Sequence, residues 1–266
     1  MSEKSTDPLF LPKLPRVKAS TELTNLRALF LQLMKQETTW KADTFPGSQP
    51  VSFERKHLGV GSGGPGAISL QTMGFYAAEK TDGMRYMLMV LGSRGAYAVD
   101  RKFEFIKLPS MSFPARGAGS GPDAGGALLD DTILDGELVV DTRRTGTEDG
   151  TIEKKKELRY LCYDACVVGG VCLMDKALPL RLMALRREVL GPRYAAEAAG
   201  YDFGAEPFGC DQKDFFSVAQ LPDLFTHVKP VISSASCFYL FVSLMSYNLH
   251  HNSRGQSRET VPAPRR

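Results

Sequence analysis

A lysine that precedes an aspartate, a glycine and an arginine is the first feature of the chain that could do chemistry. Lys80 ends a strand-like segment, and Asp82 with Gly83 then predicts a turn. Arg85 begins the next strand, so the turn would bring it close to the lysine. The pair would combine a potential nucleophile with a cation that suits phosphate or ribose hydroxyls. A solvated surface turn is the competing explanation, because three fixed positions also occur by chance.

Two carboxylates lie inside an apolar strand expected over residues 132–141. Asp135 and Glu137 are two positions apart, so both should lie on one face of the strand, with Gly136 on the other. Carboxylates inside a strand are costly unless they meet a metal, a ligand or a cation. A strand end at which both acids meet water is the alternative. Gly136 indicates a close approach of some other group to the backbone.

An aromatic residue and a third acid occur in a second strong strand, expected over residues 158–168. Tyr163 precedes Asp164, and its ring could stack on a purine. Packing in the core, with the hydroxyl reaching solvent, explains the same residue equally well.

The elements that must position these residues alternate like an antiparallel sheet with helices outside it, which predicts an α+β fold. Helices are expected over residues 20–36, 179–190 and 214–228, the second closed by Gly191 and Pro192. Further strands are expected over residues 75–79, 86–91, 96–100 and 102–108. The lysines at 154–156 are expected in a solvated turn, and the glycine-rich stretches 59–66 and 116–126 in surface loops.

Composition places the chain among ordinary globular proteins. It has 266 residues, of which 43% are hydrophobic and 24% charged, enough for one large domain or two small ones. The net charge of +3 equals that of residues 251–266 alone, so the body is not broadly basic and an RNA contact would need a local patch. Five cysteines without metal spacing predict reduced, buried thiols. We expect a soluble protein without a signal peptide, since the apolar run 237–249 is too short to span a bilayer.

The three motifs together resemble those of the covalent nucleotidyltransferases, the family of DNA ligases, RNA ligases and mRNA-capping enzymes. The matching segments are 80–85, 135–137 and 163–165, in the order that the family has them. Residues 49–52 and the threonine at position 81 are more similar to the capping guanylyltransferases than to the ligases. The resemblance covers about residues 20–234. It implies an antiparallel-sheet nucleotidyltransferase domain of the ATP-grasp-like ligase and capping type.

The resemblance also implies a function for each motif. Lys80 would attack the α-phosphate of GTP and hold GMP covalently, before GMP passes to the diphosphate 5′ end of RNA. Arg85 and Glu137 would hold the ribose and the region of the α-phosphate, Tyr163 would stack on guanine, and Asp82 would shape the turn beside the nucleotide. A Mg²⁺ or Mn²⁺ ion would assist, with Glu137 and Asp135 as metal ligands and Asp164 in support. The implied partners are GTP, the RNA end, the RNA polymerase II C-terminal domain and a separate RNA triphosphatase; no membrane partner is expected, and the location would be nuclear.

The chain departs from the family after residue 234. The later Asp-Gly strand motif, the Lys-x-Lys motif and the OB-fold domain have no counterpart in the sequence. We therefore expect a flexible segment over residues 1–19, an incomplete nucleotidyltransferase domain over 20–234 and a divergent, poorly ordered tail over 235–266, for which intron read-through, a frameshift or alternative splicing would account. Two other functions stay open: an impaired capping fragment that only binds nucleotide or transcription partners, and a fragment of an ATP-dependent polynucleotide ligase.

Overall fold

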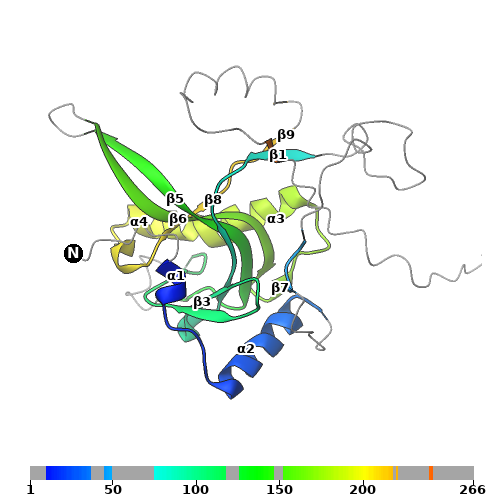
Figure 1. Ribbon diagram of the computed structural model, residues 1–266. Coiled ribbons are helices and arrows are strands. Elements are labelled where there is room, and N and C mark those ends of the chain that lie inside the picture. Colours follow the sequence, from blue (N-terminus) through cyan, green and yellow to red (C-terminus); the bar gives the residue numbers. More distant parts are fainter. Residues whose placement is uncertain are drawn as a thin grey trace, which may run out of the picture.

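The computed structural model describes residues 10–36, 45–49, 75–117, 126–146, 152–217, 220 and 240–241. Two sheets organise this part of the chain (Figure 1). The larger sheet has the order β4-β3-β2-β5-β6-β7, and β8 pairs with β6 in parallel. Its strands are β2 (Met84–Val90), β3 (Ala96–Val99), β4 (Phe105–Leu108), β5 (Thr132–Gly146), β6 (Ile152–Val168), β7 (Val171–Cys172) and β8 (Gly209–Gln212). The smaller sheet has the order β10-β1-β9, formed by β1 (Tyr76–Glu79), β9 (Phe216–Ser217) and β10 (Leu240–Phe241).

Each face of the larger sheet has its own apolar core, because successive residues of β2 alternate between the two. Met87 and Met89 pack with Phe30 of helix α2 (Ser20–Leu33). Leu88 packs on the other face, with Leu185 and neighbouring residues of the helical segment that begins with α3 (Leu178–Ala184). Figure 1 shows α2 and the α3–α4 segment on different sides of the curled sheet. The predicted α+β class with an antiparallel core is confirmed at this level.

The long β5–β6 hairpin extends further than the sequence pattern predicts. Apolar alternation indicates the strands only as far as residue 141 and from residue 158, whereas the ladder continues to Gly146↔Ile152. The lysines at 154–156, expected in a turn, lie instead within β6. Backbone hydrogen bonds between two strands need no apolar side chains, so the ladder can continue into polar sequence.

The second predicted helix does not end at Gly191 and Pro192. After α3 the chain forms a π-helix over Leu185–Leu190 and continues as α4 (Gly191–Ala198). The wide turn lets the Gly191 amide donate to the Arg186 carbonyl, and a Cβ on Gly191 would lie only 2.9 Å from that oxygen. Pro192 falls in the first turn of α4, where a missing amide hydrogen is tolerated. A Gly-Pro pair therefore marks a change of helix type here rather than an end.

The prediction of a helix over residues 214–228 is wrong for the part of that segment that the structure describes. Phe216–Ser217 forms β9 and pairs with β1, since the edge of that short strand offers free backbone groups. Residue 220 is a single 3₁₀ position, and the rest of the segment lies outside the described residues.

The N-terminal segment differs from the expected flexible stretch 1–19. From residue 10 onward it packs on the sheet: α1 (Phe10–Lys13) buries Leu11 in the core, and Arg16 forms a β-bridge with Ile106. A single leucine and isolated backbone bonds produce no periodicity, so the sequence pattern misses this contact. Residues 1–9 lie outside the described part.

Two further expectations can be compared with the structure in part. Of the tail expected over residues 235–266, only Leu240–Phe241 is described, as the strand β10 against β1. Cys162, Cys166 and Cys210 are free and buried and Cys172 is free and half-buried, whereas Cys237 is outside the described residues. Among the helices that the structure describes, none is both long and apolar enough to cross a membrane.

Candidate active site

Lys80 lies at the junction of the two sheets. It follows β1 of the smaller sheet directly, and three residues separate it from β2 of the larger sheet. Its Nζ lies 2.5 Å from a carboxylate oxygen of Asp82, whose side chain is 92% exposed. The hydrogen bond from Lys80 lowers the pKa of Asp82 below its ordinary value. The prediction of a turn at Asp82 and Gly83 is wrong, because β1 and β2 belong to different sheets and residues 80–83 connect them without a turn or bend. This connection leaves 38% of the Lys80 side chain exposed, where solvent and a ligand can reach it.

Glu137 ties the connection over residues 80–83 to β5. One carboxylate oxygen accepts a hydrogen bond from the Gly83 amide at 3.0 Å, and the other accepts one from the Thr81 hydroxyl. Gly83 leaves room for this contact, since a Cβ there would lie 2.4 Å from the Leu138 carbonyl oxygen. Glu137 therefore positions the connection that carries Lys80.

Lys213 completes the same cluster from a distant part of the chain. Its Nζ donates to the Thr81 hydroxyl at 2.8 Å and lies 3.4 Å from Glu137, and its backbone amide donates to the Cys162 carbonyl. The sequence pattern did not single out Lys213 as a site residue, because 132 positions separate it from Thr81.

Arg85 lies opposite Glu137 in the β2–β5 ladder, but its side chain forms an ion pair with the other acid of the motif, Asp135. Its guanidinium donates hydrogen bonds to both carboxylate oxygens of Asp135 and to the Ser48 carbonyl, the last at 2.6 Å. It also lies 4.8 Å from the centre of the Phe45 ring. The Asp135 side chain is fully buried. Asp135 and Glu137 thus each meet a cation, which offsets the cost of burying their charge, as expected from the sequence.

A β-bulge brings Tyr163 to the same face. The β5–β6 register passes from Asp135↔Asp164 to Gly136↔Cys162, so Tyr163 is the extra residue. Burial raises the pKa of the Tyr163 hydroxyl, and so does its hydrogen bond with the charged Asp135. Simple alternation would place Tyr163 and Asp164 on opposite faces, whereas both lie near Asp135.

Asp164 is held from the helical layer by Arg181 of α3. Two hydrogen bonds, of 2.7 and 3.0 Å, join side chains that are 0% and 2% exposed. Burial raises the pKa of Asp164, and the Arg181 guanidinium opposes that rise. Two buried ion pairs, Arg85–Asp135 and Arg181–Asp164, therefore meet across the β5–β6 ladder.

The close approach predicted at Gly136 is confirmed. A Cβ at this position would lie 2.4 Å from Cζ of Tyr160, whose hydroxyl donates to the Tyr86 carbonyl at 2.8 Å. The group that approaches is a buried protein ring on the face away from Glu137.

The described residues contain no group of three or more histidine, cysteine, aspartate or glutamate side chains placed to hold a metal ion. Both oxygens of Asp135 are engaged by Arg85, which gives this predicted metal ligand a partner within the protein. Glu137, with 17% of its side chain exposed, is the more accessible of the two predicted ligands.

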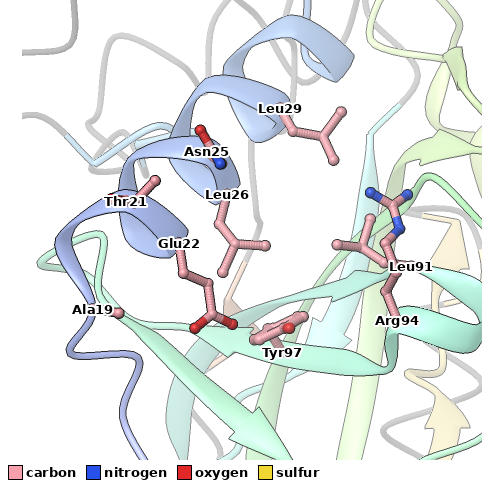
Figure 2. A pocket seen from close by; sticks show the side chains of 9 residues that line it. All are labelled: Ala19, Thr21, Glu22, Asn25, Leu26, Leu29, Leu91, Arg94 and Tyr97. Carbon is pink, nitrogen blue, oxygen red and sulfur yellow. The ribbon is translucent and has the colours of Figure 1, made fainter.

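A groove of about 550 Å³ lies elsewhere, between α2 and the β2–β3 turn (Figure 2). Leu26, Leu29 and Leu91 line it, with Glu22 and Arg94 among its polar residues. None of the predicted site residues contributes to it, so it is separate from the Lys80 junction.

An exposed lysine beside a sheet face that carries an arginine, a glutamate and a tyrosine could bind a nucleotide and take a group from it. Residues 14–236 match the family described as the mRNA capping enzyme, catalytic domain. The chain belongs to this family.

Curated relatives agree with the family match. Over 189 residues the chain is 30% identical to "mRNA-capping enzyme subunit alpha" of Kluyveromyces lactis, covering 69% of this chain and 37% of that protein. Its namesake in Saccharomyces cerevisiae is 30% identical over 71% of this chain and 39% of its own length. The Neurospora crassa protein of the same description is 38% identical over 52% of this chain and 31% of its own length. The chain thus spans less than two fifths of the length of these relatives.

Proposed function

We propose that this chain is an mRNA guanylyltransferase, which transfers GMP from GTP through a covalent lysyl-GMP intermediate to the diphosphate 5′ end of RNA. The observation that carries the proposal is the position of Lys80 in a chain of the capping family: it is exposed on the connection from β1 to β2, which Glu137 holds and Arg85 follows. GTP and the RNA end are the substrates, and the activity would be nuclear.

The first step needs the neutral amine of Lys80. Its nitrogen attacks the α-phosphorus of GTP; a P–N bond forms, the P–O bond to the β-phosphate breaks, and pyrophosphate leaves with the electron pair. The ammonium group loses one proton to solvent before the attack and a second one after it, so the phosphoramidate nitrogen keeps one hydrogen. The ion pair of Lys80 with Asp82 has to open first, and the 92% exposure of Asp82 leaves that pair well screened by water.

The second step reverses the bonding at phosphorus. A terminal phosphate oxygen of the RNA diphosphate attacks the α-phosphorus, the P–N bond breaks, and the Lys80 nitrogen takes up a proton. Arg85 and Tyr163 act on the bound nucleotide in both steps: Arg85 as a cation for ribose and phosphate oxygens, Tyr163 as a stacking partner for guanine. Asp135 keeps Arg85 in place through two hydrogen bonds.

The residues at the junction fit a Mg²⁺ or Mn²⁺ ion that takes most of its ligands from the triphosphate and water. Such ions commonly use only one or two protein carboxylates together with substrate phosphates. Glu137 is the accessible carboxylate, and Asp135 would be the second. When bound, the ion would neutralise charge on the leaving pyrophosphate.

The deciding experiment is incubation with α-labelled GTP and Mg²⁺ or Mn²⁺, followed by denaturing electrophoresis. We expect the wild-type chain to retain label, and Lys80→Ala and the charge-matched Lys80→Arg to retain none. Label from α-labelled ATP instead would identify a polynucleotide ligase. No label from either nucleotide, with GTP binding preserved, would contradict the covalent mechanism and indicate a fragment that only binds nucleotide or transcription partners.

The same reaction tests whether these 266 residues are sufficient for the first step. Two further partners belong to this proposal, the RNA polymerase II C-terminal domain and a separate RNA triphosphatase. The support for both is family membership alone.

A further inference from the structure

The turn between β3 and β4, residues 100–104, lies at the end of the larger sheet where β2 begins. Val99, the last residue of β3, is opposite Met87 of β2, and the two strands are antiparallel. Continuing this register by two residues puts Arg101 level with Arg85, one strand spacing of about 5 Å away. The turn is therefore beside the start of β2, at the junction of the two sheets.

The charges of this turn act on the start of β2. Burial raises the pKa of the Tyr86 hydroxyl, the Asp100 carboxylate adds to that rise, and the Arg16 guanidinium opposes it. Both charged groups meet at the turn, because Arg16 donates to Asp100 at 3.2 Å and also to Glu104. Since Tyr86 directly follows Arg85, these charges lie next to the predicted nucleotide site.

The N-terminal segment brings two cations to the turn. Its backbone covers the edge of β4, where Arg16 forms a bridge with Ile106 and the Val17 amide donates to the Phe105 carbonyl. Because this pairing is antiparallel, the next residue, Lys18, continues along β4 toward the turn. A contact between distant parts of the chain thus adds positive charge at this edge.

Helix α2 and the turn itself supply the other cations. Arg27 of α2 donates to the Phe103 carbonyl at 3.1 Å, and its guanidinium lies 5.6 Å from the centre of the Phe103 ring. Phe103 has a φ of 58°, which is uncommon in a residue other than glycine and persists only where neighbouring groups hold it. Arg101 and Lys102 are exposed at the tip. The turn is therefore held in one conformation that presents two cations to solvent.

We define the basic turn as residues 100–104 together with Arg16, Lys18 and Arg27. Its two acids, Asp100 and Glu104, are both engaged by the guanidinium of Arg16. Within the described part of the chain, three exposed cations of the basic turn form no ion pair with a carboxylate: Lys18, Arg101 and Lys102.

Exposed cations in other parts of the fold have acidic partners. Arg94 forms an ion pair with Asp130 at 3.1 Å. Arg116 forms one with Glu188 at 3.2 Å. At the basic turn the nearby acids are already used by Arg16, so an excess of positive charge faces solvent. Such an excess attracts a polyanion, and a nucleic acid releases counterions when its phosphates bind there.

We propose that the basic turn binds phosphates of the RNA whose 5′ end reacts at Lys80. The inference rests on the proposed function for its substrate. RNA held by its end at the junction would pass the turn with the nucleotides that follow, because the turn lies beside the start of β2. Arg101 and Lys102, the exposed residues at the tip, are the ones expected to contact phosphate oxygens.

The contact is to the body of the RNA and not to its reacting end. It should therefore act on RNA binding and leave guanylylation of Lys80 unchanged. Phosphate contacts carry no sequence information, so the turn should bind RNA of any sequence. An acidic protein surface is the other polyanion that the turn could meet. RNA is favoured because the turn is at the junction, where the body of the substrate must lie.

The test compares two double variants that each remove two neighbouring exposed cations. Arg101→Gln with Lys102→Gln neutralises the tip of the basic turn. Arg186→Gln with Arg187→Gln is the matched control, on the helical segment that covers the opposite face of the sheet from Arg85. Thermal unfolding verifies that both variants stay folded, as expected for exposed side chains.

Three quantities are then measured for each variant. The first is lysyl-GMP formation. The second is the KM for 5′-diphosphate RNA, compared between a dinucleotide and a longer unstructured RNA. The third is the binding of the longer RNA, followed by fluorescence anisotropy over a range of salt.

We expect the turn variant to bind the longer RNA about 25-fold more weakly at 0.1 M salt, because two phosphate contacts each contribute about 0.7 to the salt slope. The slope should fall by about 1.4, and the KM for the longer RNA should rise in parallel. Lysyl-GMP formation and the KM for the dinucleotide should stay at the wild-type level. The control should bind RNA within about twofold of wild type, since exposed charges more than about 10 Å away are screened at this salt.

Three results would overturn the inference. Unchanged RNA binding in the turn variant would remove the contact, and an equal loss in both variants would reduce the effect to net charge. Competition by polyglutamate as effective as that by RNA would favour an acidic protein partner. Failure of the proposed function looks different: Lys80 would take no label, while anisotropy would still separate the turn variant from the control.

Discussion

The two ends of the β5–β6 hairpin are built differently. At the sheet end, Asp135 and Asp164 are fully buried, and each pairs with an arginine from another element of the fold. At the outer end, beyond Leu138 of β5 and before Arg159 of β6, the two strands pair only with each other. Buried charges need partners that match them closely, whereas charges in water tolerate poor neighbours at small cost. A charged residue at the sheet end should therefore tolerate substitution far less than an exposed one.

The largest expected effect is the loss of one partner from a buried pair at the sheet end. Arg181→Met would leave the Asp164 carboxylate buried without its cation and next to Asp135. We expect the free energy of unfolding to fall by about 3–5 kcal/mol, measured by urea denaturation.

Two variants sharpen this measurement. Arg187→Met removes an arginine from the same helical segment where the side chain is 61% exposed, and should change stability by less than about 0.5 kcal/mol. Adding Asp164→Asn to Arg181→Met should recover part of the loss, because the uncompensated charge disappears. A single Arg181→Met variant as stable as the Arg187→Met control would show that the sheet end tolerates an unpaired buried charge.

A smaller effect is expected from packing behind the site. Gly136→Ala would place a Cβ 2.4 Å from the Tyr160 ring and 2.7 Å from the Leu161 carbonyl oxygen. Overpacking of this kind should lower the free energy of unfolding by about 1–3 kcal/mol.

Gly209→Ala on β8 is the matched control for Gly136→Ala. Its nearest heavy atom would be Cγ of Arg159 at 4.0 Å, an ordinary contact, so stability should change by less than about 0.5 kcal/mol. Thermal unfolding of the two variants side by side gives the comparison. Equal melting temperatures would mean that Tyr160 moves away freely, contrary to the close packing inferred for the sheet end.

Much of the site was predictable because its motifs are local. The two acids of β5 and the aromatic strand around Tyr163 each occupy a few consecutive residues, and each is confirmed in position. The turn predicted after Lys80 is absent, because β1 pairs in one sheet and β2 in the other. Alternation also predicted the strand cores, since burial on a sheet repeats every two residues. Their catalytic and binding assignments stay predictions that the labelling experiment tests.

The partners of these motifs were not predictable in the same way. Lys213, Arg181 and Ser48 come from segments far from the motifs they contact, and no local pattern connects such positions. The prediction that a helix ends at Gly191 and Pro192 was wrong for a related reason. Gly-Pro ordinarily ends a helix, and only the π-turn made here against Arg186 lets the chain continue.

The sequence by itself determined which residues could do chemistry, the strands that present them and the family to which they belong, because these depend on residue type and short spacing. Tertiary structure decided which of those residues share a face. The bulge at Tyr163 overrides the alternation that would separate it from Asp164, and Lys213 reaches Thr81 and Glu137 because β8 pairs with β6. Both follow from backbone pairing between distant segments, which fixes side-chain direction only once the partner strand is in place.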